Sequence, residues 1–413
     1  MVTVRPFKAV RPRDEIAHKV ASFPYDVLDS KEARELAKDD EYSFLHVVKP
    51  EIDLPEDVDL YDESVYQKAK SNFYGMIEKG VLVQDDKPHL YVYRQIMDGH
   101  EQYGIVGCAS ADEYNNDIIK KHEFTRKKKE DDRTKHVITL NANAGPVFLT
   151  YRDNAKIDAM VAKTAANKPE VDFTAPDGIQ HTVWVIKDKD ITAGINETFK
   201  TDVDFLYVAD GHHRSASAAR AKAEKLKNDP NPNDEKEYNY FLAVFFPAQQ
   251  LKILDYNRVL FTMNGLSKDE FRAKVAEKFE FTGKMEDRPS SAQEFGMYMD
   301  GEWQIIKAKE GTFPGDDPVE SLDVAILQNN LLAPILGIGD PRSDENVDFV
   351  GGIRGTKELK KRVDSGECSM AFCLFPTSIE QLMSVADAGK VMPPKSTWFE
   401  PKLRSGLMTH LLD

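Results

Sequence analysis

One stretch of five residues offers a metal ligand, a flexible turn and three donors for an anion: Asp210-Gly211-His212-His213-Arg214. It follows a strand-like run, 205–209, and precedes an alanine-rich run with helical character, 215–226. A glycine at such a turn lets the backbone approach a ligand closely, and the free N–H groups at the start of the next helix favour an anion. The stretch therefore predicts a phosphate site. The alternative is an ordinary strand-to-helix turn with a capping aspartate and surface histidines.

Each residue of the turn has an expected part in that site. The guanidinium of Arg214 matches two phosphate oxygens in a fork, and the two histidines add further donors. Asp210 is the candidate ligand of Mg²⁺ beside the phosphates. The expected phosphate ligands are Gly211, His212, His213, Arg214 and Ser215.

Length, composition and charge limit which classes of protein the chain can belong to. The chain has 413 residues, of which 41% are hydrophobic and 30% charged, so two closely associated globular domains are expected. Its formal net charge of −15 disfavours nucleic acids and anionic membranes, which favours a small-molecule substrate. Three cysteines without metal-ligand spacing, no apolar run long enough to cross a bilayer and no signal-peptide core predict a cytoplasmic protein.

Short β-rich runs alternate with amphipathic helical runs along the whole chain, which predicts a mixed α/β or α+β fold. We expect a first domain over 1–263, a second α/β domain over 264–390, and an ordered C-terminal loop or tail over 391–413. The expected strands are 42–48, 90–95, 103–108, 147–151, 181–186, 205–209, 240–246, 251–255, 259–262, 296–299, 303–308, 347–350 and 370–375. The expected helices are 31–38, 63–79, 215–226, 268–279, 320–336, 357–363 and 379–388.

The C-terminal stretch 392–406 contains three prolines and suits neither a helix nor a central strand. Its residues Lys395, Ser396 and Thr397 are of the kind that grip phosphates, as are the later cations Lys402 and Arg404. The adjacent Trp398 and Phe399 could anchor the loop or stack on a base. A hydrophilic tail is the alternative interpretation.

Six motifs occur in an order and spacing that resemble the domain-of-unknown-function family 1015 over essentially the whole chain. One departure is Phe23-Pro24, where the family usually carries two prolines. The motifs are Pro24-Tyr25-Asp26-Val27, Tyr93-Arg94-Gln95, His122-Glu123-Phe124-Thr125, the turn 210–214, Asp255-Tyr256-Asn257-Arg258, and 395–406.

The turn also resembles the nucleotide-phosphate motif of the ParB and sulfiredoxin superfamily, which includes kinases that phosphorylate free L-serine. This resemblance implies a ParB/sulfiredoxin-like nucleotide-binding core with a C-terminal α/β extension. It also implies a phosphotransferase that uses ATP or ADP with Mg²⁺. The superfamily's aspartate carries over to Asp210, and its phosphate-binding turn to Gly211, His213 and Arg214. Glu123 is assigned the role of the kinases' glutamate on chemical grounds.

Phosphoryl transfer to an alcohol needs a base, for which Glu123 and His122 are the candidates. An ordinary helix start explains the same pair of residues. A small zwitterionic acceptor would place its ammonium group near Tyr25 and Asp26. Its carboxylate would meet Arg94, with Arg133 and Arg258 as alternatives, although a structural ion pair explains each arginine equally well.

Two other functions stay open. His122, Glu123, Asp210, His212 and His213 could be the ligands of a hydrolytic metal centre, although no His-Glu-x-x-His spacing is present. A nucleotide-binding regulatory protein without catalysis is the second alternative. The expected partners are a nucleotide and a small molecule, and a homodimer stays open.

Overall fold

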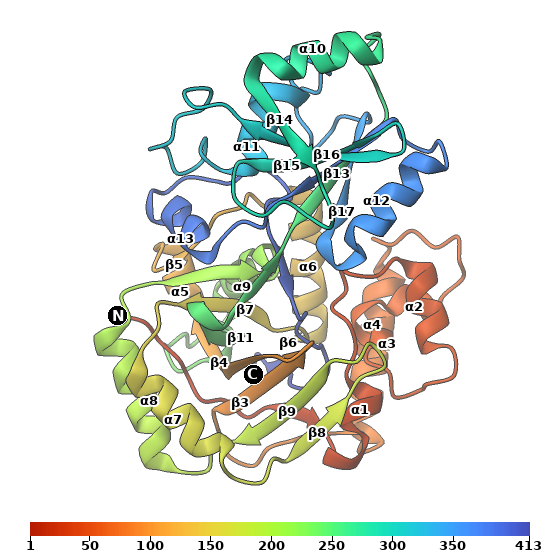
Figure 1. Cartoon of the computed structure of the whole chain (residues 1–413). Coiled ribbons are helices and arrows are strands. Elements are labelled where there is room, and N and C mark those ends of the chain that lie inside the picture. Colours follow the sequence, from red (N-terminus) through yellow and green to blue (C-terminus); the bar gives the residue numbers. More distant parts are fainter. The chain divides into compact units, whose positions relative to one another are not determined.

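The computed structural model describes residues 1–413 and divides them into two compact units (Figure 1). Unit 1 consists of Met1–Leu251 together with Pro401–Asp413, and unit 2 is Lys252–Glu400. This division differs from the expected boundary at residue 263, because the strand Tyr256–Leu260 pairs within the sheet of unit 2. The C-terminal stretch is shared between the two units instead of forming a separate tail.

Unit 1 is built on an eight-stranded mixed sheet whose strand order is β5-β10-β7-β11-β4-β3-β9-β8. In that order the strands are Ile119–Lys120, Leu206–Asp210, Val147–Tyr151, Tyr240–Pro247, His100–Ser110, Tyr91–Met97, Gln180–Val185 and Val171–Thr174. Two short antiparallel pairs accompany it, β1 (Val10–Pro12) with β2 (Leu82–Gln84), and β6 (Ala142–Asn143) with β20 (His410–Leu411). The last pair ties the end of the chain to unit 1.

Two helices of unit 1 show the local signals that the sequence predicted for their ends. Helix α2 has a capping box in which Asp29 accepts from the backbone of Glu32 and Glu32 accepts in return. Helix α4 buries its apolar face and is followed by Gly80 at a φ of 68°. The helices are α1 (Ala17–Val20), α2 (Ser30–Ala37), α3 (Leu45–Val48), α4 (Glu63–Glu78), α5 (Ala111–Asn115), α6 (Lys127–Leu140), α7 (Ala155–Ala165), α8 (Lys189–Asp202) and α9 (His212–Asn228).

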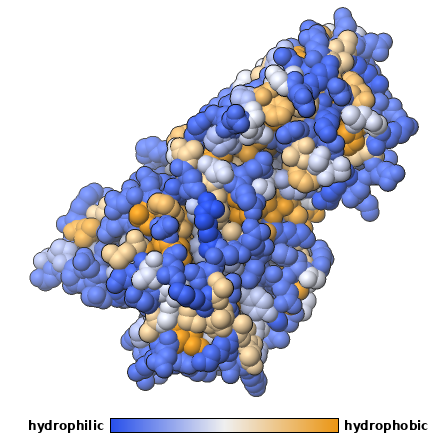
Figure 2. All heavy atoms as spheres, turned by 60° about the vertical axis from the view of Figure 1, so that its left-hand side comes forward, coloured by the Kyte–Doolittle hydropathy of each residue, from blue (hydrophilic) through white to orange (hydrophobic).

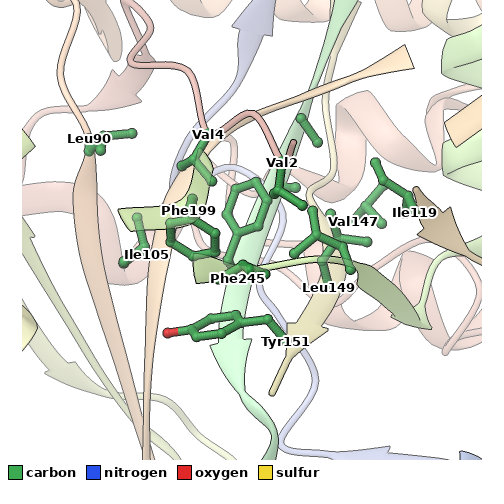
Figure 3. Close-up of a cluster of buried hydrophobic side chains, with 14 of the residues drawn as sticks. Val2, Val4, Leu90, Ile105, Ile119, Val147, Leu149, Tyr151, Phe199 and Phe245 are labelled. Atoms are coloured by element: carbon green, nitrogen blue, oxygen red, sulfur yellow. The ribbon is translucent and has the colours of Figure 1, made fainter. Parts of the chain in front are cut away.

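Two hydrophobic clusters hold these layers together. One joins the sheet to α7, α8 and the N-terminal segment, and Figure 3 shows Val2 and Val4 above Phe199, Phe245 and Tyr151. The other joins α2, α3, α4 and α6, which Figure 1 shows in part at the right of unit 1. Leu140 of α6 belongs to the second cluster, and Ala216, Ala218 and Ala219 of α9 belong to the first. Burial of these side chains positions the two helices, which pack on each other.

Unit 2 contains an antiparallel six-stranded sheet of order β14-β16-β15-β18-β13-β17. In that order its strands are Phe279–Lys284, Glu302–Ala308, Glu294–Met299, Met370–Leu374, Tyr256–Leu260 and Val347–Gly351. A separate pair joins β12 (Lys252–Leu254) to β19 (Trp398–Glu400). The helices are α10 (Lys268–Lys278), α11 (Asp323–Leu327), α12 (Gly355–Asp364) and α13 (Ile379–Asp387).

The mixed α/β class is confirmed, while two of the expected elements differ in type or extent and the helices α7 and α8 were not among those expected. The run 42–48 is helical at α3 instead of extended, because short apolar runs do not distinguish a buried helix from a strand. The run 320–336 is helical only at its centre, where α11 continues into a π-helical turn, Gln328–Leu332.

Hydrophilic side chains cover most of the face drawn in Figure 2, with small hydrophobic areas between them. None of the helices is long and apolar enough to cross a membrane.

Candidate functional site

The turn that the sequence singles out lies at the carboxyl end of β10, where Gly211 begins α9 in a left-handed conformation with a φ of 99°. A Cβ atom at this position would lie 3.0 Å from Nε of Arg214 and 3.1 Å from its Cζ. Only glycine adopts this backbone without strain, and a side chain here would force the guanidinium to shift by a few tenths of an ångström. The glycine therefore lets the first turn of α9 fold over the Arg214 side chain.

The sequence predicted that the guanidinium of Arg214 is open to bind two phosphate oxygens. In the structure both of its terminal nitrogens are hydrogen-bonded within the protein. Its Nη2 donates to Oδ2 of Asp210 at 3.0 Å, and its Nη1 donates to the backbone carbonyl of Pro146. The remaining nitrogen, Nε, is buried and has no hydrogen-bond partner. In this structure the arginine and the aspartate of the turn are each other's partners.

The second cation at Asp210 comes from the last residues of the chain. Nζ of Lys402 lies 3.8 Å from Oδ2 of Asp210, and the lysine side chain is only 12% exposed. Burial would raise the pKa of the Asp210 carboxyl, but Lys402 and Arg214 together lower it to about 2. Asp210 is therefore a carboxylate at any physiological pH.

Side chains of the sheet hold Lys402 in place. Gln95 of β3 donates from Nε2 to the backbone carbonyl of Lys402 at 3.0 Å. Two residues further on, the buried Arg404 forms an ion pair with Asp177 and donates from Nε to His181 at 3.2 Å. The C-terminal segment is thus bonded to the sheet of unit 1 at the Lys402 carbonyl and again at Arg404.

Two buried imidazoles meet beside the turn. The ring of His122 stands edge-on to the ring of His212, with centroids 4.5 Å apart. Nδ1 of His122 and Nε2 of His212 are buried without a hydrogen-bond partner. Burial lowers the pKa of His122 to about 4 and lowers that of His212 well below its ordinary value, so both rings are neutral at pH 7.

The loop between β5 and α6 brings Glu123 to the same place. Oε2 of Glu123 lies 3.7 Å from Nδ1 of His212, and the glutamate side chain is 49% exposed. The next histidine, His213, accepts a hydrogen bond at Nε2 from the backbone N–H of Arg126 at 3.0 Å. His213 therefore fastens this loop to α9. Glu123 lies in the loop before α6 and not in a helix, which removes the interpretation of an ordinary helix start.

Ser215 is a buried part of the helix and donates from Oγ to the carbonyl of Gly211 at 3.2 Å. The hydroxyl of Ser215 thus hydrogen-bonds the backbone of the turn itself.

Tyr25 and Arg133 line a small cavity together with Arg214. The guanidinium of Arg133 lies 4.3 Å from the centroid of the Tyr25 ring and pairs with Asp132. The cavity has a volume of about 40 Å³, which suits a few water molecules and not a nucleotide. Asp26 follows Tyr25 and is close enough to influence the pKa values of Arg214 and His213.

Arg94 lies away from this group. It alternates with Gln95 along β3 and so points to the opposite face of the sheet. There its Nη2 donates to Thr182 at 3.0 Å and its guanidinium lies near the rings of Tyr103 and Trp184.

The remaining sequence candidates, Lys395, Ser396 and Thr397, belong to unit 2, as does Arg258. Ser396 donates from Oγ to the carbonyl of Pro393 at 2.6 Å. Trp398 anchors the chain here, because its ring covers Gly351, where a Cβ would lie 2.6 Å from the indole.

Mg²⁺ was expected at Asp210. Its carboxylate is already paired with Arg214 and Lys402, and no three His, Cys, Asp or Glu residues are arranged to hold a metal ion. Mg²⁺ is commonly held by one or two carboxylates together with the phosphates of a bound substrate. No such group of three side chains supports the hydrolytic metal centre, and Mg²⁺ at Asp210 beside nucleotide phosphates stays a prediction.

The sequence did not predict that Lys402 lies beside Asp210 of the turn, although Lys402 was named among the cations of the C-terminal stretch. The whole of unit 2, 252–400, lies between Asp210 and Lys402 along the chain, so no local pattern connects the two residues.

Comparison with known proteins gives a family and a few distant structures. A family model described as "Protein of unknown function (DUF1015)" matches residues 4–325. No curated protein matches the chain. The similar solved structures include a free serine kinase in complex with AMP, 13% identical, with a TM-score of 0.34, covering 72% of this chain and 86% of that chain.

Two further structures are a conserved hypothetical protein from Pyrococcus furiosus and SbnI with a C-terminal truncation from Staphylococcus aureus. The first is 13% identical with a TM-score of 0.35, and covers 75% of this chain and 95% of that chain. The second is 12% identical with a TM-score of 0.32, and covers 74% of this chain and 87% of that chain. At these scores the likeness adds no weight to the assignment of the site.

Proposed function

Because the chain belongs to the DUF1015 family, whose name assigns no activity, we propose a function from the site itself. Unit 1 is a phosphotransferase that binds the phosphates of ATP or ADP at the start of α9 and transfers a phosphoryl group to the hydroxyl of a small metabolite. Free L-serine is the proposed acceptor, and this choice rests on the sequence resemblance alone.

The observation that carries the proposal is a group of buried nitrogens without partners at the positive end of α9. They are Nδ1 of His122, Nε2 of His212 and Nε of Arg214. A buried polar group without a partner costs about 1–3 kcal/mol, and native proteins keep few of them. Three such nitrogens at or beside one helix start, near the largely buried Lys402, support an anionic ligand as the missing partner.

The exposed Glu123 is the better of the two candidate bases. In the proposed step the acceptor oxygen attacks the terminal phosphorus, the bond to the leaving phosphate oxygen breaks, and the hydroxyl proton moves to a Glu123 oxygen. His122 is sealed from solvent, so an acceptor hydroxyl does not reach its ring, and its part is to position the loop and His212. Lys402 and the N–H groups of α9 offset the negative charge on the leaving phosphate.

The test is a transfer assay with the full chain. Purified protein is incubated with ATP or ADP, Mg²⁺ as the nucleotide salt, and a panel of hydroxy-amino acids and sugars, and phosphorylated product is measured. Glu123→Gln should lower turnover by about 10²–10⁴-fold while nucleotide affinity stays close to that of the wild type. Glu197→Gln, on an exposed position of α8, is the matched control and should keep full activity. Full activity in Glu123→Gln would move the base to another residue.

A nucleotide-binding protein without catalysis is the second candidate. It is favoured by the hydrogen bonds that already engage His213 and both terminal nitrogens of Arg214 within the protein. Binding of ATP or ADP without phosphorylation of any acceptor in the panel would select this function over the phosphotransferase.

A further inference from the structure

Unit 2 contains a buried arginine that no carboxylate neutralises. Arg258 is 4% exposed, and its hydrogen bonds go to the backbone carbonyls of Tyr256 and Pro394, the latter at 3.4 Å. The ring of Phe349 lies 5.1 Å from its guanidinium carbon. The nearby buried carboxylate of Asp255 is bonded instead by Asn257 and, at 3.5 Å, by Arg288.

Such a residue is unusual in a chain with 70 acidic residues. Buried arginines are almost always paired, because an uncompensated charge in the interior is costly. Burial lowers the pKa of Arg258 only to about 10, so the guanidinium keeps its charge at pH 7. The side chain is therefore a cation with a missing anionic partner.

The loop over this arginine has free donors of its own. Lys395 has a φ of 59°, a left-handed conformation that is uncommon outside glycine. None of the backbone N–H groups of Lys395, Ser396 and Thr397 donates a hydrogen bond within the protein. Consecutive free N–H groups around a left-handed residue form a concave site that favours an anion.

Lys395 adds a second cation to the same place. Its side chain is exposed, and Nζ lies 5.4 Å from the centroid of the Tyr256 ring. That ring is fixed from behind, since Trp398 meets it edge-on at 5.3 Å and covers Gly351. Pro394, which precedes the lysine, is the residue whose carbonyl accepts from Arg258. Arg258 of β13 is thus hydrogen-bonded to the loop that carries the second cation and the free N–H groups.

We propose that unit 2 holds a phosphate-binding site formed by Arg258, Lys395 and the backbone N–H groups of residues 395–397, with the Thr397 hydroxyl at its edge. A phosphate group has enough acceptor oxygens to take donors from two cations and a row of N–H groups at once, which a single carboxylate does not. The proposal uses residues of unit 2 alone and does not depend on the function proposed for unit 1.

The test measures phosphate binding by the full chain. Inorganic phosphate and pyrophosphate are titrated calorimetrically into the wild type and into Lys395→Met, whose exposed side chain can be removed without opening the core. We expect saturable binding that Lys395→Met weakens about tenfold or more, the usual effect of losing one charge-assisted contact. Arg258→Lys keeps a charge but loses the fork, and should weaken binding as well. Lys361→Met, at an exposed position of α12, is the matched control and should bind as the wild type does.

Further arms separate this site from that of unit 1 and identify the source of the phosphate. Lys402→Met alters only the phosphate site proposed for unit 1, so any phosphate binding that it removes belongs to that site, and the binding that Lys395→Met weakens should persist in it. Titration with ADP and with adenosine shows whether the phosphate is part of a nucleotide, since adenosine alone should not bind here. Wild-type affinity for phosphate in Lys395→Met, or no phosphate binding by the wild type, would overturn the proposal. Failure of the transfer assay, in contrast, would leave it untouched.

Discussion

Replacing Lys402 with methionine tests whether the end of the chain belongs to the site. The substitution keeps most of the side-chain volume and removes the ammonium group 3.8 Å from the Asp210 carboxylate. At an effective dielectric constant of about 20, two unit charges at this distance attract each other by about 4 kcal/mol. The net loss is smaller, because Arg214 stays bonded to Asp210 and methionine is easily buried. We expect a loss of about 1–3 kcal/mol in the unfolding free energy, between the values for exposed and buried pairs.

A double-mutant cycle isolates this contact. Urea denaturation is measured for the wild type, Lys402→Met, Asp210→Asn and the double variant, and the coupling energy should account for most of the loss. Lys156→Met, which removes a lysine paired with Asp202 at an exposed position of the same unit, should cost no more than about 1 kcal/mol. A coupling energy indistinguishable from zero would show that Lys402 does not hold Asp210 in solution. It would also remove the lysine from the proposed mechanism.

Three further outcomes are expected. Gly211→Ala should lower stability by about 1–3 kcal/mol, because it forces a side chain onto a φ of 99° and against Arg214; an unchanged urea midpoint would contradict that geometry. Arg404→Met should destabilise unit 1 by about 1–3 kcal/mol, since it removes the buried guanidinium that bonds Asp177 and His181. It should also weaken nucleotide binding, because it loosens the segment that carries Lys402. Retention of both properties would show that the segment is held by other contacts. Burial raises the pKa of Asp323 to about 7, so this carboxyl binds its proton more tightly in the folded state than in the unfolded state. The free energy of unfolding should therefore fall as pH rises from about 4 to about 7. Asp323→Asn should flatten this dependence, which urea titrations at several pH values measure.

The sequence by itself determined the elements whose signals are local. Strand β7 and helix α4 were predicted closely, because residue type, hydrophobic periodicity and capping act over a few neighbours. The strand-to-helix turn at Gly211 was predicted for the same reason, since a glycine between a strand-like and a helical sequence pattern marks such a turn. The run 42–48 shows the limit, because its few apolar residues suit a helix and a strand equally well.

Only the tertiary structure decided which charges meet. Arg214 turned back to Asp210 instead of facing outward, Lys402 reached the same carboxylate from the end of the chain, and Arg258 was buried without an anion. Pairing between charges far apart in sequence depends on how the sheet and its helices pack, and no local pattern encodes that distance. The physical reason is that a side chain's type fixes what it can bind, whereas burial and neighbours brought by the fold determine what it does bind.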